Sequence, residues 1–337
     1  MINKTVTDCL ICENQAVLIA NDFSGYQEPD KFKIFECPKC NTSFALPLID
    51  VKNVYENIYN NAERTPGYNR YVFYQKKVKK VKNPLEYLAK SEEAYWVVKE
   101  ALYRERERPG KIIEVGSGLG YLTYSLRKEG HDIVGLDISE NAVFDAINNF
   151  GDYYLCEDVN NYAKNNEEKY DVVILTEVIE HIPDPVTFLR SLIKILKKGG
   201  IIIMTTPNKT FFDSYEDVVW VPDLPPVHFY WFSEKSMKYI SRIIKADVSF
   251  IDFTEFYSSK ESLISEDWFS LNPFFDEKGL LKKKYNKNPI FFCIFFSLVR
   301  INFIAKLIKI LFGRSKSFIS YKLGKKGPSM GCILKKI

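Results

Sequence analysis

The sequence predicts an α/β protein with a parallel sheet, preceded by a small domain built around four cysteines. A glycine-rich turn between an apolar strand and a helix, at residues 111–129, and the alternation of strand and helix patterns that follows it predict the sheet. Two C-x-x-C pairs predict the small domain. We expect this domain at residues 1–50, a helical linker or lid at 51–110, and the α/β domain at 111–337.

The bulk composition is that of a globular protein. The chain has 337 residues, of which 46% are hydrophobic and 27% charged, enough for two or three domains with a sizeable core. A net charge of +4 is too small to indicate a nucleic-acid partner. The N-terminal stretch lacks the apolar region of a signal peptide, and no run of about 18 uncharged apolar residues predicts a spanning helix. We therefore expect a cytoplasmic protein with reduced thiols.

Two C-x-x-C pairs, separated by 24 residues, are formed by Cys9, Cys12, Cys37 and Cys40. Two thiolates at this spacing bind one ion from a tight turn, and two such turns complete a tetrahedral site. Between the pairs, residues 16–20 and 32–35 have strand patterns. Four thiolates leave no open coordination position, so the sequence predicts a structural zinc ion. The alternative is four structural cysteines without a metal.

The glycine-rich turn contains Gly116, Gly118 and Gly120. Glycines at such a turn let a ligand approach the backbone closely, because no Cβ intervenes. The G-x-G-x-G spacing differs from the G-x-G-x-x-G of dinucleotide folds. Asp137 ends the next strand pattern, seventeen residues beyond Gly120, where a carboxylate can accept hydrogen bonds from a ribose diol.

Further strand patterns follow in DYYLCEDV, YDVVILT, IIIMTTPN and ADVSFIDF, with the last in PSMGCILKK. About seventy residues, at about 258–327, separate the last two strands. We interpret them as a helical insertion.

These residues resemble the class I S-adenosylmethionine-dependent methyltransferases over about 111–253 and the last strand. EVGSGLG is similar to the first motif of that family, LDIS to the second, CEDV to the third and LTEVIEHIPDP to the fourth. The resemblance implies a Rossmann-like sheet of seven strands, one of them reversed, with the cofactor over the carboxyl ends of the strands. The E-H-I-P-D-P ending is typical of enzymes that methylate small molecules such as quinones and sugars. Sugar-modifying branches of that subgroup often carry an N-terminal zinc ribbon.

The resemblance also implies roles in binding S-adenosylmethionine. The backbone at Gly116, Gly118 and Gly120 would pass under the aminoacyl and ribose portions. Glu114 would lie beneath the ammonium end, and Asp137 would bind the ribose hydroxyls.

The adenine end would be held by the second and third motifs. Asp158 would face the adenine amino group, while Ile138 and Val159 would sandwich the ring. Glu177 would lie where the fourth strand opens into the active site. For each acid, the alternative is a helix cap or a solvated loop charge.

Two histidines are candidates for the base. Methyl transfer from a sulfonium is an in-line displacement, but a hydroxyl or ammonium acceptor must also lose a proton, which suits histidine. His228 and His181 both follow the carboxyl ends of strands, where ligands bind in open α/β sheets. We interpret His228 as the base and His181 as the second candidate or a brace for its loop. The alternative is catalysis by positioning alone.

The helical segment at 51–110 contains a series of tyrosines, namely Tyr55, Tyr59, Tyr68, Tyr71 and Tyr74. Two interpretations stay open for them: lining an acceptor pocket, or packing in the core or an interface.

The predicted function is methyl transfer to a hydroxyl, or an amine or carbon, of a sugar, a glycan-biosynthesis intermediate or a lipid-like precursor. The fourth motif reads Thr176-Glu177-Val178-Ile179 where methyltransferases of nucleobase amines carry an N-P-P-Y type of turn. Two alternatives are an RNA methyltransferase whose ribbon grips RNA, and a non-catalytic interaction platform.

Residues 289–314 are apolar with interspersed basic residues. One interpretation is a helix that docks on anionic lipid at the inner membrane face, as a peripheral contact. The other is a lid or dimer contact.

Overall fold

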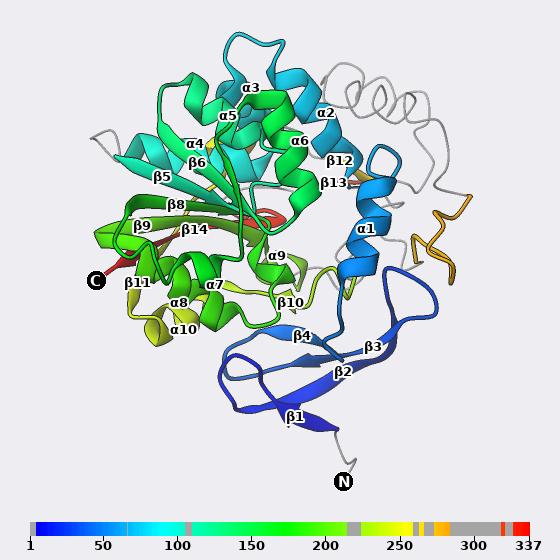
Figure 1. The fold of residues 1–337 in the computed structure, drawn as a ribbon. Helices are drawn as coiled ribbons and strands as arrows, with labels where there is room; N and C mark the ends of the chain where they lie inside the picture. The colour runs from blue at the N-terminus through cyan, green and yellow to red at the C-terminus, as the bar shows by residue number, and fades with distance from the viewer. Residues whose placement is uncertain are drawn as a thin grey trace.

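The computed structural model describes residues 5–65, 67–104, 110–213, 224–258, 263–265, 273–283, 318–320 and 326–337. The described chain forms a seven-stranded sheet between helices, with a smaller five-stranded sheet beside it (Figure 1). The membrane or lid segment predicted at 289–314 lies outside the described residues.

The large sheet has the strand order β11-β14-β9-β8-β5-β6-β7. Its strands are β5 (Lys111–Val115), β6 (Asp132–Asp137), β7 (Tyr154–Cys156), β8 (Tyr170–Thr176), β9 (Leu196–Pro207), β11 (Ala246–Phe250) and β14 (Ser329–Lys336). Neighbouring strands are parallel except at β14, which runs antiparallel to both β9 and β11. The prediction of seven strands with one reversed is confirmed.

Helices cover both faces of this sheet (Figure 1). One face packs against α2 (Asn69–Val78), α3 (Pro84–Ser91), α4 (Glu93–Arg104), α5 (Tyr121–Lys128), α6 (Glu140–Phe150) and α11 (Thr254–Ser258). The other packs against α7 (Val159–Tyr162), α8 (Pro185–Ile195) and α10 (Glu234–Ile243). Successive strand residues alternate between the two cores, so Ile112 lies in the first and Ile113 in the second.

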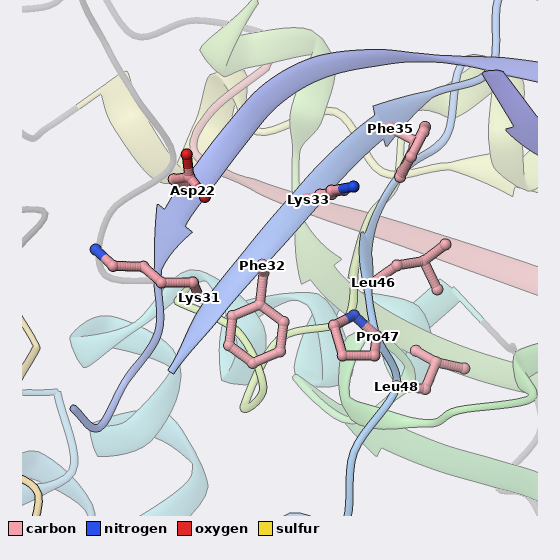
Figure 2. Close-up of a pocket in the computed structure, with 8 residues that line it drawn as sticks. All are labelled: Asp22, Lys31, Phe32, Lys33, Phe35, Leu46, Pro47 and Leu48. Atoms are coloured by element: carbon pink, nitrogen blue, oxygen red, sulfur yellow. The ribbon is translucent and has the colours of Figure 1, made fainter. Parts of the chain in front are cut away.

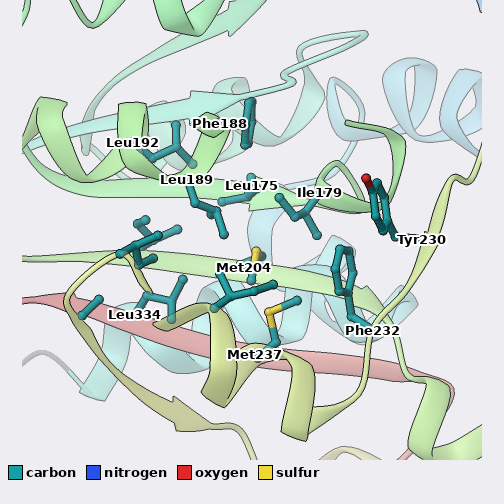
Figure 3. Packing of buried hydrophobic residues seen from close by; sticks show 14 of the residues in the cluster. Leu175, Ile179, Phe188, Leu189, Leu192, Met204, Tyr230, Phe232, Met237 and Leu334 are labelled. Atoms are coloured by element: carbon teal, nitrogen blue, oxygen red, sulfur yellow. The ribbon is translucent and has the colours of Figure 1, made fainter. Parts of the chain in front are cut away.

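Figure 3 shows the second core from close by. Strand residues such as Met204 and Leu334 meet Leu189 of α8 and Met237 of α10. Tyr230 and Phe232 enter the same cluster, although they come from a segment that also pairs with the small sheet.

The small sheet, which we call the ribbon, has the order β1-β2-β3-β4-β10 and is antiparallel throughout. Its strands are β1 (Val6–Asp8), β2 (Gln15–Ser24), β3 (Lys31–Glu36), β4 (Ser43–Leu46) and β10 (Tyr230–Trp231). The last strand comes from the α/β domain. The sequence did not predict this pairing, because β10 is two residues long and has no periodicity of its own.

A groove of about 650 Å³ crosses the ribbon (Figure 2). Its lining combines apolar and charged side chains, namely Asp22, Lys31, Phe32, Lys33, Phe35, Leu46, Pro47 and Leu48. All of them lie within the small N-terminal domain, and none is a candidate cofactor residue.

The remaining elements connect these parts. Helix α1 (Lys52–Asn60) leads from the ribbon to α2, so the helical pattern at 51–110 corresponds to α1–α4. A short 3-10 helix, η1 (Ile179–His181), follows β8, and α9 (Lys209–Phe212) follows β9. Within the predicted helical insertion, β12 (Leu263–Ser265) and β13 (Phe318–Ser320) form an antiparallel pair instead. Among the described helices, none has the length and apolar character needed to cross a bilayer.

Candidate functional site

The glycine turn at the end of β5 is tightly packed at two positions and open at the third. All three glycines have positive φ: 75° at Gly116, 48° at Gly118 and 79° at Gly120. A Cβ added at Gly116 would lie 2.6 Å from a side-chain carbon of Val178. A Cβ added at Gly120 would lie 2.7 Å from the Cβ of Ala146. At Gly118, no described atom would lie within 4 Å. Close packing therefore requires the outer glycines, while the middle one faces open space.

Asp137 ties the end of β6 to this turn. Its Oδ2 accepts a hydrogen bond from the Gly118 N–H at 2.7 Å, and its Oδ1 accepts one from the Ser139 N–H at 2.9 Å. Burial raises the pKa of the carboxyl, although both backbone donors lower it. A carboxylate has about four acceptor positions, so this one keeps capacity for ligand hydroxyls beside the open face of Gly118.

The residues predicted at the adenine end differ in exposure. Ile138 is 72% exposed directly after Asp137 and offers an apolar surface to a flat ring, whereas Val159 is 4% exposed. Asp158 caps α7, because its Oδ1 accepts hydrogen bonds from the N–H groups of Asn160 at 2.9 Å and Asn161 at 3.2 Å. The helix-cap alternative thus describes Asp158 here, and its contact with adenine stays a prediction.

Glu114 is a buried carboxyl beneath the turn. It is 3% exposed and accepts a hydrogen bond from the Thr123 hydroxyl. Burial raises the pKa of Glu114 to about 8, so most of it is protonated at neutral pH. A cationic group bound above it would favour the ionised form.

The chain leaves β8 in an unusual conformation at Glu177. Its φ is 54°, which is uncommon for a side chain of this kind, and its N–H donates to the Thr205 carbonyl at 3.1 Å. The next residue is Val178, the one that packs against Gly116. The first and fourth motifs therefore meet at the carboxyl edge of the sheet.

A carboxylate and two imidazoles gather beyond this edge. Glu180, His181 and His228 each offer one atom, and these atoms lie within 4.8 Å of one another. The two imidazole rings meet edge to face, with 4.5 Å between their centroids. Glu180 is fully buried, and its Oε2 accepts a hydrogen bond from the Thr206 hydroxyl at 3.0 Å.

The hydrogen bonds of His181 fix its tautomer. Its Nδ1 lies 2.6 Å from the Val227 carbonyl, which only accepts, so Nδ1 carries the proton. In the neutral ring, Nε2 then carries the lone pair and lies 3.8 Å from Oε1 of Glu180. An imidazole oriented in this way is able to take a proton or to bind a metal ion.

His228 has a different electrostatic environment. Burial, together with the guanidinium of Arg70, lowers the pKa of His228 to about 3. Arg70 is held on α2 by Glu92, whose Oε1 lies 3.3 Å from its Nε. A neutral imidazole of such low basicity is a weak proton acceptor, although it is the form that binds metals.

The tyrosines of α1 and α2 divide between the two interpretations. Tyr55 lies edge-on to His181, with 6.2 Å between the ring centroids. Tyr59 stacks on Tyr55, with 6.3 Å between their centroids. Burial and then the charge of Asp137 raise the pKa of Tyr59, yet 38% of this residue is exposed. Tyr55 is thus in contact with His181, and Tyr59 is close enough to Asp137 for its charge to act on the phenol. Tyr74 instead packs in the core, 3% exposed, against Tyr95 and Tyr121.

The four cysteines of the ribbon converge. The Sγ atoms of Cys9 and Cys40 are 3.6 Å apart, those of Cys12 and Cys37 are 3.4 Å apart, and all four lie within 4.8 Å of one another. Tetrahedral zinc with bonds of about 2.3 Å sets its sulfurs about 3.8 Å apart. The donor set and the spacing therefore fit one zinc ion.

The two cysteine turns share one backbone geometry. Each C-x-x-C pair is followed by a residue in the left-handed region, Glu13 at φ 59° and Asn41 at φ 57°. The N–H of Glu13 donates to the Cys9 carbonyl at 2.9 Å, and that of Asn41 donates to the Cys37 carbonyl at 2.8 Å. This repetition is what two equivalent metal-binding turns require.

A family model described as a methyltransferase domain matches residues 90–242. The chain carries a methyltransferase domain. Its predicted resemblance to the class I family is confirmed, since the sheet order has the single reversed strand that the resemblance implies.

Curated relatives match the methyltransferase domain over about a hundred residues. A ubiquinone biosynthesis O-methyltransferase of Aliivibrio fischeri is 36% identical over 104 residues, which cover 29% of this chain and 44% of the relative. The mitochondrial ubiquinone biosynthesis O-methyltransferase of Dictyostelium discoideum is 38% identical over 115 residues, covering 30% and 36%. The chain thus spans less than half the length of these relatives. A solved SAM-dependent methyltransferase from Archaeoglobus fulgidus aligns with a TM-score of 0.42 at 19% identity, covering 72% of this chain and 94% of that one.

The methyltransferase domain brings most predicted site residues together at the carboxyl ends of β5, β6 and β8. Their individual roles stay predictions. Sequence reasoning missed Glu180, although it stands next to His181 in the fourth motif. It also missed Arg70, whose only signal was its position among the tyrosines of the helical segment.

The open face of Gly118 gives a first prediction. Gly118→Ala and Gly199→Ala should destabilise the fold equally, by about 1–2 kcal/mol, because both glycines have positive φ and open surroundings within the described chain. Only Gly118→Ala should also weaken binding of S-adenosylmethionine, by about tenfold or more, since its methyl group enters the cofactor space. Calorimetric titration and thermal unfolding measure the two effects. Equal affinities in the two variants would contradict the site.

The carboxylate of Asp137 gives a second prediction. Asp137→Ala should lower the affinity for S-adenosylmethionine by about 10²-fold, because hydrogen bonds to a charged group are worth about 1.5–3 kcal/mol each. Asp132→Ala, at the opposite end of the same strand, is the matched control and should bind normally. Calorimetric titration with S-adenosylmethionine measures both affinities. Unchanged affinity in Asp137→Ala would contradict the assignment of Asp137 to the ribose hydroxyls.

Proposed function

We propose that this protein transfers the methyl group of S-adenosylmethionine to an oxygen atom of a small molecule. The observation that carries the proposal is the orientation of His181, with its Nε2 lone pair beside a buried carboxylate, at the sheet edge that holds Asp137 and the glycine turn. The names of the curated relatives, which are O-methyltransferases, support oxygen as the acceptor atom.

The cofactor would lie over the turn of Gly118, with its ribose on Asp137 and its adenine against Ile138. Glu114 would ionise beneath its ammonium group. S-adenosylmethionine held by these residues would supply a methyl group near the fourth motif, because Val178 of that motif packs directly on Gly116. The protein's main contribution is then to align donor and acceptor.

When bound, S-adenosylmethionine would supply an electrophilic methyl group: the acceptor oxygen would bond to it as the carbon–sulfur bond breaks, and the sulfur would keep the electron pair. The hydroxyl proton passes to Nε2 of His181. Glu180 stabilises the resulting imidazolium, and the Val227 carbonyl holds the ring in place.

This mechanism changes the assignment of the base from His228 to His181. A base is most effective when its pKa lies near the working pH, and the pKa of about 3 at His228 is far below it. His228 would instead confine the ring of His181 through their edge-to-face contact.

The same three side chains form a donor set for a divalent cation, with one carboxylate oxygen and two imidazole nitrogens. A cation held there would lower the pKa of a bound acceptor hydroxyl. Activity with and without a chelator separates this route from proton transfer to His181 alone.

The acceptor would be a hydroxylated ring. Tyr55 stacks with Tyr59 and lies edge-on to His181, and aromatic faces bind flat rings as well as the apolar faces of sugars. The relatives' names refer to ubiquinone biosynthesis, which favours an aromatic ring. A sugar or glycan intermediate, which the ribbon suggests by resemblance, stays a prediction.

The role of His181 gives a third prediction. With catechol as the acceptor probe, His181→Gln should lower kcat by about 10²–10⁴-fold, the usual contribution of a general base. Its affinity for S-adenosylmethionine should not change. His228→Gln should lower kcat less, because it removes packing and no proton acceptor. Formation of S-adenosylhomocysteine is the readout, with Mg²⁺ or a chelator in parallel assays. A fully active His181→Gln variant would refute the assignment.

We also propose that the cysteine cluster binds one structural zinc ion. Purified protein should contain one zinc per chain by elemental analysis, and Cys37→Ser should lose it, because Cys37 is fully buried in the cluster. Cys156→Ser is the matched control, since Cys156 is exposed and lies outside the cluster. Zinc-free protein with an intact fold would contradict this proposal.

A further inference from the structure

Residues 224–233, which we call the bridge segment, lie between the ribbon and the histidine site. The segment contains His228 and supplies the Val227 carbonyl to Nδ1 of His181 at 2.6 Å. The N–H of Phe229 donates to the Glu180 carbonyl at 2.9 Å. Every member of the carboxylate–imidazole cluster is therefore in the bridge segment or bonded to it.

The other side of the bridge segment is bonded to the ribbon. The Phe229 carbonyl accepts a hydrogen bond from the Ala45 N–H at 2.9 Å, and the Pro225 carbonyl accepts one from the Tyr26 N–H at 2.7 Å. Strand β10 continues the ribbon, with Tyr230 paired to Phe44 and Trp231 to Ser43.

The second cysteine turn docks on the end of the bridge segment. Asn41, which follows Cys40, accepts hydrogen bonds at its carbonyl from the hydroxyls of Ser233 and Ser236, each at 3.0 Å. These serines also form the capping box of α10. Beside them, Nζ of Lys235 donates to the Pro38 carbonyl at 3.1 Å.

A buried ion pair joins the same surfaces. Lys209 is 1% exposed, and its Nζ lies 2.8 Å from Oε2 of Glu36, the residue before Cys37. The N–H of Lys209 donates to the Phe232 carbonyl at 2.9 Å. Lys209 also pairs with Asp213 in the next turn, so its buried ammonium joins a carboxylate of the ribbon to one of the α/β domain.

The apolar core is also continuous across the contact. The four cysteines and Phe44 belong to the same buried cluster as Phe229, Tyr230 and Phe232. Figure 3 shows Tyr230 and Phe232 inserted beside Ile179 and Met237 of the α/β domain. Displacing the ribbon would therefore expose part of the core beneath the site.

We infer that the metal-bound ribbon positions His181 and His228 through the bridge segment, and thereby forms part of the acceptor half of the site. A zinc ion at the four cysteines would lock the turn that carries Asn41, which holds Ser233 and the strand behind it. The coupling between the cysteine site and the bridge segment rests on the proposed zinc site, and the catalytic consequence rests in addition on the proposed methyl transfer. The positioning residues are Ser233, Ser236 and Lys209.

Hydrogen–deuterium exchange of zinc-loaded and chelator-stripped protein tests this coupling. After stripping, amides of the bridge segment should exchange at least about tenfold faster, because their partners on the ribbon are released. Amides of β5 and β6 should keep their protection, and added zinc should restore the bridge segment. Unchanged protection after removal of zinc would overturn the inference. Equal loss of protection in β5 and β6 would also overturn it, because the metal would then support the whole fold.

A variant without changes in cysteines or histidines separates docking from metal loss. Ser233→Ala combined with Ser236→Ala removes the contacts to Asn41 and should accelerate exchange in the bridge segment while zinc content and S-adenosylmethionine affinity stay normal. Asp252→Ala, which loses the cap of α11, is the control for general destabilisation. With an acceptor in hand, KM for the acceptor should rise in the double variant alone. Failure of methylation with every acceptor would refute the proposed function and leave the exchange result intact. Identical exchange in the double variant and the control would refute positioning.

Discussion

The backbone of Phe229 is bonded on both sides, and the contact between the ribbon and the fourth motif depends on that arrangement. Its N–H reaches the Glu180 carbonyl and its carbonyl receives the Ala45 N–H, each at 2.9 Å. If either partner were removed, a buried N–H or carbonyl of Phe229 would be left unpaired, at a cost in stability comparable to one lost hydrogen bond. The ribbon and the fourth motif therefore cannot move independently while this residue stays buried. The same contacts restrict His228, which precedes Phe229 in the chain, and His181, which follows Glu180.

The cofactor half is built differently, from contacts close in sequence. The turn of Gly118 and the end of β6 are joined by one hydrogen bond to Asp137, and each belongs to a strand of the same parallel sheet. Packing at Gly116 and Gly120 leaves room only for hydrogen in place of a side chain. The proposed cofactor contacts therefore lie within the α/β domain, whereas the proposed acceptor contacts at the histidines also depend on hydrogen bonds to the ribbon.

Local patterns explain why much of this could be predicted from the sequence. The C-x-x-C pairs, the glycine turn and the apolar strands each show their chemistry within a few residues, so the sheet and the convergence of the cysteines follow from them. The pairing of β4 with β10 leaves no such signal, because two residues carry no period. The roles of Glu180 and Lys209 were equally hidden, since a buried charge is recognised only with its distant partner. The sequence could not show which tyrosines lie beside the histidines and which lie in the core. The difference between Tyr55 and Tyr74 is in the residues that pack against them, His181 and Tyr95 respectively.

The environments of the two histidines could not be distinguished from the sequence, because they depend on residues that are distant in the chain. In the sequence, His228 stands among prolines and aromatic residues, which suggests a cover over an acceptor. The fold places the guanidinium of Arg70 near it and buries it, and both effects disfavour the imidazolium. His181 has different neighbours, since the Val227 carbonyl lies 2.6 Å from its Nδ1 and Oε1 of Glu180 lies 3.8 Å from its Nε2. In the proposed mechanism, the acceptor proton would therefore pass to His181, and His228 would hold that ring in place through their edge-to-face contact.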